Sequence, residues 1–257
     1  MKIFYTLTIV CLSFIGNAQS ADEILDKYFQ VNGGRESMGQ KFDNTKEVYE
    51  INLIERKMIA TQFVFKNRFN KEKTIYEWNS GEKDTVKIRS VKIFNGKKGC
   101  DFMFKGNNLA YVKDWDENKN LRKQKGRSSL LDACRSVKES GDSATYEGVE
   151  EFNNKKCYKI KYVKSYQNYD STSDDQNLEY HFFDILTSLE VGIKNFDKKG
   201  VETSSIIEDF SVINGLTIPK RILLKKSDNV YGIVTLKEFK SDVILPEKEF
   251  EKEYYTR

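Results

Sequence analysis

The sequence predicts a mainly β protein with a few helices, in which the strands form one antiparallel sheet. From about Lys46 onward, apolar and polar residues alternate over many short stretches, which is the period of a half-buried strand. Turn sequences such as Asn95-Gly96 and Asn214-Gly215 separate these stretches, and tight turns join antiparallel neighbours. A meander of this kind must bury one of its faces.

The alternation and the turn residues together predict thirteen strands, which begin near residue 48 and end near residue 239. In chain order they are 48–53, 59–66, 74–78, 86–94, 100–104, 109–112, a strand from 143, 157–162, 178–183, 189–196, 201–210, 216–225 and 230–239. Further turns are expected at Asn79-Ser80-Gly81, Asn153-Asn154 and Asp228-Asn229.

Two segments have helical periodicity instead. In Asp22–Gln30 the apolar residues recur at helical spacing, Asp22 can cap the start, and Gly33 and Gly34 follow the end. Ser128–Glu139 places its apolar residues on one side in the same way. Each apolar stripe needs a partner surface, so we expect both helices to cover the sheet. The charged end of the chain, 246–257, is expected to be peripheral.

The first twenty residues have the pattern of a secretory signal peptide. Lys2 is followed by the uncharged apolar run 3–15 and then by small and polar residues, with cleavage expected after Ala18 or Ser20. The run is shorter than the roughly 20 residues that span a bilayer. Cys11 lies inside it, too early for lipidation. The sequence therefore predicts export to the periplasm, no stable membrane insertion, and one mature domain, 21–257.

Composition and chemistry exclude several classes of function. Without Lys2 there are 42 basic and 39 acidic residues, a charge of +3 that argues against a nucleic-acid binder. His181 is the only histidine and CxxC spacing is absent, so no metal or other cofactor is expected. A strand histidine is favoured over a general base. The acidic residues near Asp114 and Asp170 are expected to be solvated, and the chain is not expected to be an enzyme.

Three cysteines, Cys100, Cys134 and Cys157, remain after the signal peptide, and an odd number cannot form a complete disulfide framework. A Cys134–Cys157 pair is one alternative, but single buried thiols are favoured.

A strongly curved sheet has a concave face, and incomplete cover by the helices would leave an apolar groove suited to acyl chains. Plain core is the alternative role for aromatic residues at strand spacing. The candidates for the cavity lining are aromatic residues at alternate strand positions, namely Phe63, Phe65, Tyr76, Trp78, Phe102, Phe104, Tyr180 and Phe182.

Four segments, taken in order, resemble the LolA-like family of periplasmic lipoprotein-sorting carriers. They are the opening helix ADEILDKYFQVNGG, the hairpin VKIFNGKKGCDFMF (91–104), the later hairpin EGVEEFNNKKCYKIKYV (147–163) and the run IIEDFSVINGLTIPKRILLK (206–225). The likeness lies in their order and spacing, and together they cover most of the mature chain. Polar insertions near Asp114–Arg127 and Ser165–Asn177 depart from a minimal carrier, and no basic residue matches a ligand-gating position of the family.

The resemblance implies an open or half-closed antiparallel β-barrel whose concave face is covered by helices. It also implies a non-enzymatic periplasmic carrier that holds the acyl chains of a lipid or a lipidated protein. The alternative is an envelope protein-interaction or scaffold module that uses the same fold without lipid cargo.

Overall fold

The computed structural model describes residues 20–36, 38, 44–67, 71–80, 86–117, 120, 143–163, 175–197 and 199–256. The expected signal peptide up to Gln19 and the expected helix Ser128–Glu139 lie outside the described residues. So do 121–127 and 165–174 of the two polar insertions. All statements below concern the described part of the chain.

All thirteen predicted strands are present, and neighbouring strands pair in antiparallel orientation. The bounds are β1 Thr45–Leu53, β2 Met58–Asn67, β3 Lys71–Ser80, β4 Val86–Asn95, β5 Gly99–Lys105, β6 Asn108–Asp114, β7 Ser143–Phe152, β8 Lys155–Val163, β9 Asp175–Asp184, β10 Glu190–Asp197, β11 Glu202–Ile213, β12 Leu216–Lys226 and β13 Asn229–Ser241. Asn79 and Ser80, where a turn was expected, still belong to β3 and pair with Lys87 and Val86 of β4.

The strands form one sheet that the last strand joins together. Its order is β6-β5-β4-β3-β2-β1-β13-β12-β11-β10-β9-β8-β7, so β13 pairs with β1 and connects two meanders. β6 and β7 are its two edges and do not pair with each other, so the sheet is not closed into a barrel. This confirms the predicted open antiparallel β-barrel.

The helix α2, Ala21–Val31, begins where the sequence predicts but with a different cap. Ser20, not Asp22, is the N-cap residue. Its hydroxyl accepts a hydrogen bond from the Glu23 amide at 3.2 Å, and the Glu23 carboxylate accepts one from the Ser20 amide at 3.3 Å. This reciprocal pair is a capping box. The predicted apolar stripe is confirmed, since Ile24, Leu25, Tyr28 and Phe29 are all buried.

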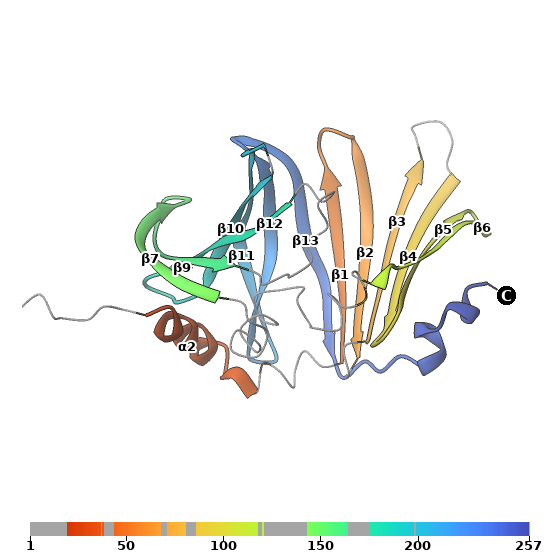
Figure 1. Cartoon of the computed structure of the whole chain (residues 1–257), viewed down its shortest axis with the longest axis horizontal. Coiled ribbons are helices and arrows are strands. Elements are labelled where there is room, and N and C mark those ends of the chain that lie inside the picture. The colour runs from red at the N-terminus through yellow and green to blue at the C-terminus, as the bar shows by residue number, and fades with distance from the viewer. Residues whose placement is uncertain are drawn as a thin grey trace, which may run out of the picture.

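The apolar stripe of α2 packs into a cluster that reaches from β1 to β7. The cluster includes Tyr49 of β1, Leu236 of β13, Phe183 of β9 and Tyr146 of β7. In a flat sheet, seven strand steps of about 4.8 Å would separate β1 from β7 by about 34 Å. An eleven-residue helix is only about 16 Å long. The sheet must therefore curve around α2, and the face that α2 contacts is the concave one (Figure 1).

The C-terminal residues 247–255, which we call the C-terminal strap, are not peripheral as expected. They form two short 3-10 helices, η1 Glu247–Phe250 and η2 Lys252–Tyr254, which lie beside β4, β5 and β6 (Figure 1). Phe250 is only 1% exposed. The Tyr255 ring lies 4.9 Å from that of Phe102, which the register places on the face opposite α2. The strap therefore covers the convex face.

Ion pairs hold the strap against the sheet. Glu247 pairs with Lys71, and Glu249 accepts a hydrogen bond from the buried Lys73 ammonium at 2.6 Å. At the other end the Lys252 ammonium lies 2.7 Å from Asp114 Oδ2. Composition alone marked this segment as charged, but its charges are matched to specific partners on β3 and β6.

Cys100 and Cys157 are both buried, free thiols, as the favoured prediction held. Burial raises the pKa of each thiol to about 11, with neighbouring carboxylates, Asp114 and Asp184 respectively, adding to the rise. Cys134 lies outside the described residues. The Cys157 thiol donates to the Lys155 carbonyl oxygen at 3.4 Å.

Candidate functional site

The concave face carries an uninterrupted row of apolar side chains. Residues that pair directly on antiparallel strands point to the same face, so the register alone defines this row. It crosses seven neighbouring strands from β11 to β4, and we call it the apolar row: Ile207, Ile222, Val234, Ile51, Ala60, Trp78 and Ile88. Ile207 and Ala60 are buried, whereas the other five side chains are only half-buried. The row lies on the same face as Tyr49 and Leu236, which contact α2.

A second row runs beside the apolar row. Leu53, Gly232 and Leu224 pair across β1, β13 and β12, and Ser205 and Ile193 continue the row on β11 and β10. The two leucines close over Gly232. A Cβ atom there would lie 3.2 Å from Leu53 Cδ2 and 3.3 Å from Leu224 Cδ1. The two rows together give the concave face a broad apolar surface.

A buried polar cluster borders this surface near the start of β1. The Tyr49 hydroxyl donates to Glu47 Oε2 at 2.7 Å, and the Lys66 ammonium lies 3.3 Å from Glu47 Oε1. Burial, together with the adjacent Glu47 charge, raises the pKa of Tyr49 far above its usual range, so this phenol stays protonated. The Glu47 carboxylate is therefore satisfied by the protein itself, and the cluster fixes the base of the concave face.

His181 lies in the second row on β9 and is fully buried. Its Nδ1 is 2.5 Å from Glu190 Oε1 and its Nε2 is 3.4 Å from Glu179 Oε2. Burial lowers the pKa of the imidazole, but hydrogen bonds to Glu179 and Glu190 outweigh it and raise the pKa to about 9. His181 is therefore an imidazolium at neutral pH. Both ring nitrogens contact carboxylates, in agreement with the prediction of a structural histidine in a strand. With both nitrogens protonated, the ring has no lone pair with which to act as a general base.

The structure divides the eight aromatic candidates between the two faces. Tyr76 and Trp78 lie on the concave face, where Trp78 belongs to the apolar row and the Tyr76 hydroxyl accepts a hydrogen bond from Gln62 at 3.0 Å. Phe63 and Phe65 point to the convex face, because Phe63 pairs with Ile75 while Gln62 pairs with Tyr76.

The remaining four candidates also point to the convex face and pack in separate clusters. Phe102 and Phe104 are buried with Val91 and Ile93 beneath the strap. Phe182 is buried with Tyr180 in another cluster, where its ring stacks on Phe152 at 4.1 Å. The eight residues thus do not form one site. The half-buried aliphatic residues of the apolar row were not singled out from the sequence, although each is an alternating apolar residue of its strand.

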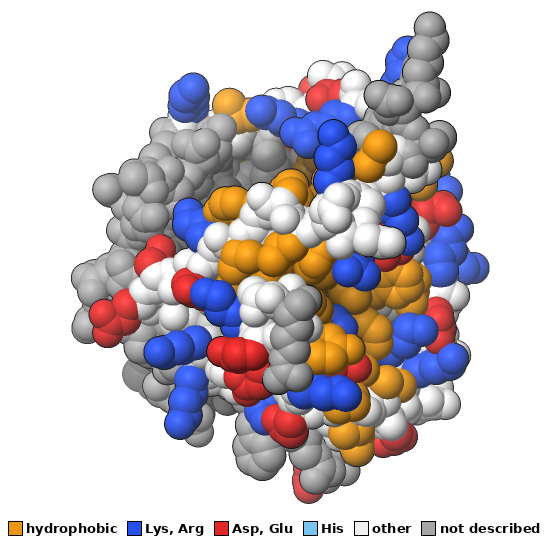
Figure 2. Space-filling model, turned by 90° about the vertical axis from the view of Figure 1, so that its right-hand side faces the viewer, with side chains coloured by type: hydrophobic (Ala, Val, Ile, Leu, Met, Phe, Trp, Pro, Cys, Tyr) orange, Lys and Arg blue, Asp and Glu red, His pale blue; other side chains and the backbone are white. Residues whose placement is uncertain are grey.

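Hydrophobic side chains also gather on the outside of the molecule, on the side of β5, β6 and the strap. Figure 2 shows them in the middle of that side, bordered by Lys, Arg, Asp and Glu side chains. The exposed apolar residues of these elements are Met103, Leu109, Tyr111 and Tyr254. Met103 pairs with Tyr111 and with Ser90, the partner of Tyr76, so Met103 and Tyr111 point to the concave face, whereas Tyr254 belongs to the strap on the convex face. They adjoin β6, one of the two edge strands.

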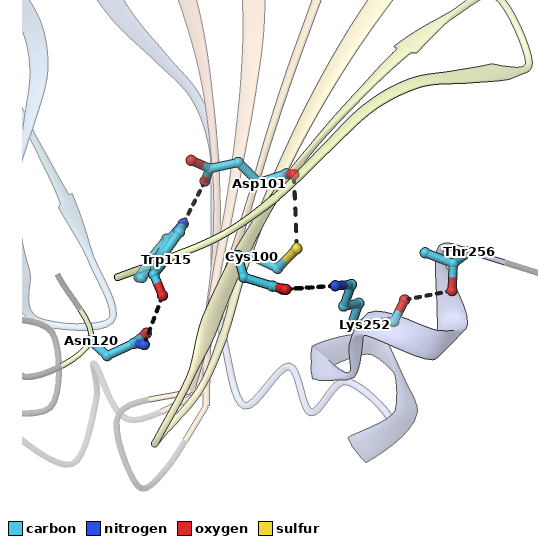
Figure 3. A network of polar contacts seen from close by, with 7 residues as sticks. Cys100, Asp101, Trp115, Asn120, Lys252 and Thr256 are labelled. Carbon is cyan, nitrogen blue, oxygen red and sulfur yellow. Dashed lines mark hydrogen bonds and ion pairs between the residues drawn. The ribbon is translucent and has the colours of Figure 1, made fainter. Parts of the chain in front are cut away.

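A cavity of about 400 Å³ lies between the strap and the β4–β5 hairpin. Figure 3 shows the polar contacts around it. Trp115 Nε1 donates to Asp101 Oδ1 at 2.7 Å, the Asn120 side chain accepts from the Gly99 amide at 2.7 Å, and Lys252 reaches Asp114. The lining carries both signs of charge and the buried Cys100 thiol. These groups are largely satisfied by one another, so the arrangement is structural.

No group of three or more His, Cys, Asp or Glu side chains in the described part of the chain is arranged to hold a metal ion. Glu179 and Glu190 illustrate the reason, because they lie at opposite nitrogens of His181 and do not converge on one point. Among the described helices, none has the length and apolar composition required to cross a membrane.

The fold and the concave apolar surface define a class of structure: an open, curved antiparallel sheet with a helix on its inner face. No family model matches the sequence, and no curated protein matches it. Solved structures do match. A DUF1329 family protein from Desulfovibrio piger ATCC 29098 superposes with a TM-score of 0.56 at 11% identity, covering 88% of this chain and 96% of that chain.

Two further solved structures are similar in fold to this chain. A domain named for outer membrane lipoprotein sorting, from Vibrio parahaemolyticus, has a TM-score of 0.57 at 9% identity, covering 90% of this chain and 99% of that chain. A LolA superfamily protein from Nitrosomonas europaea has a TM-score of 0.56 at 13% identity, covering 92% and 100%. The chain therefore has a divergent LolA-like fold, which confirms the resemblance drawn from its sequence.

Proposed function

We propose that this protein is a non-enzymatic carrier or binder in the periplasm, which holds the acyl chain of a lipid or a lipidated protein on its concave face. The observation that carries the proposal is the apolar row, which crosses seven strands on the face that α2 covers only in part. The predicted signal peptide places the chain where apolar cargo needs cover from water.

The energetics of the row favour an elongated apolar ligand. Seven strands at about 4.8 Å spacing make a row about 29 Å long. Five of its seven side chains are only half-buried, and each methylene group of a ligand that leaves water on binding contributes about 0.8 kcal/mol. A chain-shaped ligand that lies along the row would gain this contribution repeatedly, without any specific polar contact.

The chemistry of the described residues supports binding over catalysis. Both nitrogens of His181 are engaged by carboxylates, and burial holds the pKa of the Cys100 and Cys157 thiols near 11, so neither thiol is an activated nucleophile. The fold likeness to a lipoprotein-sorting domain points the same way.

Uptake of a fluorescent fatty acid by the mature chain tests the proposal. Val234 and Ile233 are adjacent half-buried residues of β13 that point to the concave and convex faces respectively. We expect Val234→Asn to weaken uptake about tenfold and Ile233→Asn to leave it within about twofold, because only Val234 would contact the ligand. Equal effects of both variants, or no uptake by the wild type, would contradict the carrier proposal.

An envelope scaffold module is the second candidate, and one observation favours it. Met103, Leu109, Tyr111 and Tyr254 expose apolar surface beside the edge strand β6, where a partner chain could add to the sheet. Tyr254→Glu should then abolish a protein complex isolated from envelope extract and leave fatty-acid uptake unchanged, because the strap lies on the convex face. A complex that survives this substitution would reject the scaffold candidate at this edge.

A further inference from the structure

Four segments at one end of the sheet carry no charged side chain. Because the chain is a meander, the β9–β10 turn, the β11–β12 turn and the exit of β13 all lie at this end. The helix α2 ends there as well, with Asn32 accepting a hydrogen bond from the Thr217 amide at 3.2 Å. The four segments are 31–34, 185–189, 212–217 and 243–246, and none contains Asp, Glu, Lys or Arg, whereas the β7–β8 turn at the same end carries Lys155 and Lys156.

Each of these segments displays an aliphatic side chain to solvent. Leu186 is 93% exposed, Val212 74%, Ile244 73% and Val31 47%. We call these four residues the aliphatic rim. Hydrogen bonds connect the segment of Val31 with that of Val212: Asn32 accepts from the Thr217 amide, and on the same β11–β12 turn the Asn214 side chain donates to Ser241 Oγ of β13 at 3.2 Å. These parts of the rim are therefore held together, and Leu186 stands on a separate turn at the same end.

The turn that presents Leu186 is built to hold it outward. The Asp184 carboxylate accepts hydrogen bonds from the amides of Leu186 at 2.7 Å and of Thr187 at 3.1 Å. The Ser188 amide donates to the Asp184 carbonyl oxygen at 2.8 Å. Backbone groups satisfied within the turn can approach an apolar phase without losing hydrogen bonds to water. Removing this turn from water together with the Leu186 side chain therefore costs little free energy.

We propose that the aliphatic rim docks this end of the protein on the surface of a lipid bilayer. The four side chains stand on separate segments and form no groove, and a fluid bilayer accepts separate protruding side chains without shape complementarity. Protein interfaces instead favour aromatic residues and arginine, which the four segments lack. Lys155 and Lys156 lie beside the Leu186 turn, where the Ile185 amide donates to the Lys156 carbonyl oxygen at 3.1 Å, and their ammonium groups match the phosphate layer of a bilayer.

Flotation of the mature chain with vesicles tests the rim independently of any cargo in the concave face. Vesicles of phosphatidylcholine alone and of phosphatidylcholine with phosphatidylglycerol should both bind the wild type. Leu186→Glu should weaken binding at least about tenfold, because the variant loses the apolar side chain that would leave water and places a charge there instead. The matched control is Ile59→Glu on β2, since Ile59 is 62% exposed and lies outside the rim. This variant should bind as the wild type does.

Val234→Asn, which alters the concave face, should also leave vesicle binding unchanged, so failure of the rim and failure of the carrier proposal are distinguishable. Absence of wild-type binding to both vesicles would overturn the bilayer proposal, as would equal binding by Leu186→Glu. Binding to the anionic vesicles alone would show attraction by lysine without insertion, and would also overturn it. Capture of an envelope protein that depends on Leu186, without vesicle binding, would assign the rim to a protein partner instead.

Discussion

Leu53 and Leu224 converge on the same glycine, Gly232, from the two strands that flank β13. A Cβ atom at Gly232 would lie 3.2 Å from Leu53 Cδ2 and 3.3 Å from Leu224 Cδ1, so the leucine side chains leave little room for one. Such contacts are slightly tighter than the usual separation of carbon atoms, and the flexible ends of the leucines can adjust. The glycine therefore keeps the concave surface free of an extra side chain.

A large side chain at Gly232 should block the concave face. Gly232→Phe would push Leu53 and Leu224 apart and place an aromatic ring on the concave face beside the apolar row. We expect fatty-acid uptake to fall severalfold while the circular dichroism spectrum remains that of a β protein. Gly232→Ala is the control: it adds one methyl group and recovers about 0.5–1 kcal/mol of backbone entropy, so uptake should stay within about twofold. Unchanged uptake by Gly232→Phe would show that ligand does not lie here.

The buried His181 should make stability depend on pH. Its folded-state pKa of about 9 lies above the ordinary value of 6.5, so the folded protein binds this proton more tightly than the unfolded chain does. The stabilisation is complete below about pH 6.5 and is lost as pH rises through about 9. Relative to His181→Gln, the wild type should lose about 3 kcal/mol of unfolding free energy over this range. Urea unfolding at several pH values measures it, and a constant difference between the two proteins would contradict the ion-pair assignment.

The capping box of α2 distinguishes the two predicted cleavage positions of the signal peptide. Cleavage after Ala18 leaves Gln19 at the mature N-terminus and keeps the Ser20 cap, whereas cleavage after Ser20 would remove it. Loss of such a cap costs about 1 kcal/mol. Intact-mass measurement of the exported protein should therefore give a chain that begins at Gln19. Ser20→Ala should lower the unfolding free energy by about 1 kcal/mol, and no change would show that the cap contributes nothing.

The strap should protect the Cys100 thiol. Phe250 is buried beside Cys100 in the strap cavity, so Phe250→Ala should cost about 3 kcal/mol and loosen this region. Alkylation followed by peptide mapping should then show faster modification of Cys100, while Cys157, which is buried in another cluster, stays protected. The exposed Tyr254→Ala is the control and should change neither quantity. Equal modification of Cys100 in the wild type and Phe250→Ala would contradict this role.

Much of this fold follows from local patterns. Alternation identified all thirteen strands, and the helical spacing of Ile24, Leu25, Tyr28 and Phe29 identified the buried stripe of α2. The N-cap was misplaced because Ser20 and Asp22 are both acceptable capping residues, and only the contact with Glu23 distinguishes them. The pairing of β13 with β1 links residues about 190 positions apart in the chain, for which no local pattern exists.

The candidate site was predicted less well, for a geometric reason. Alternation shows that Phe63 and Phe65 share a face, as do Tyr76 and Trp78, but it cannot show whether the two pairs face the same way. The β2–β3 register decides this, and a shift of one residue would reverse the answer. The packing of the strap on the sheet could not be predicted either, because the partners of Glu247 and Glu249 lie on β3, far away in sequence.

Native mass spectrometry of the protein purified from the periplasm tests the carrier proposal most directly. If the apolar row holds an acyl chain, the wild type should carry a lipid-sized adduct that organic extraction removes. The adduct should be reduced in Val234→Asn and retained in Ile233→Asn, since only the first substitution changes the concave face. A wild-type protein that carries no adduct under gentle conditions, and takes up no added fatty acid, would contradict the proposal that this sheet is a carrier of apolar chains.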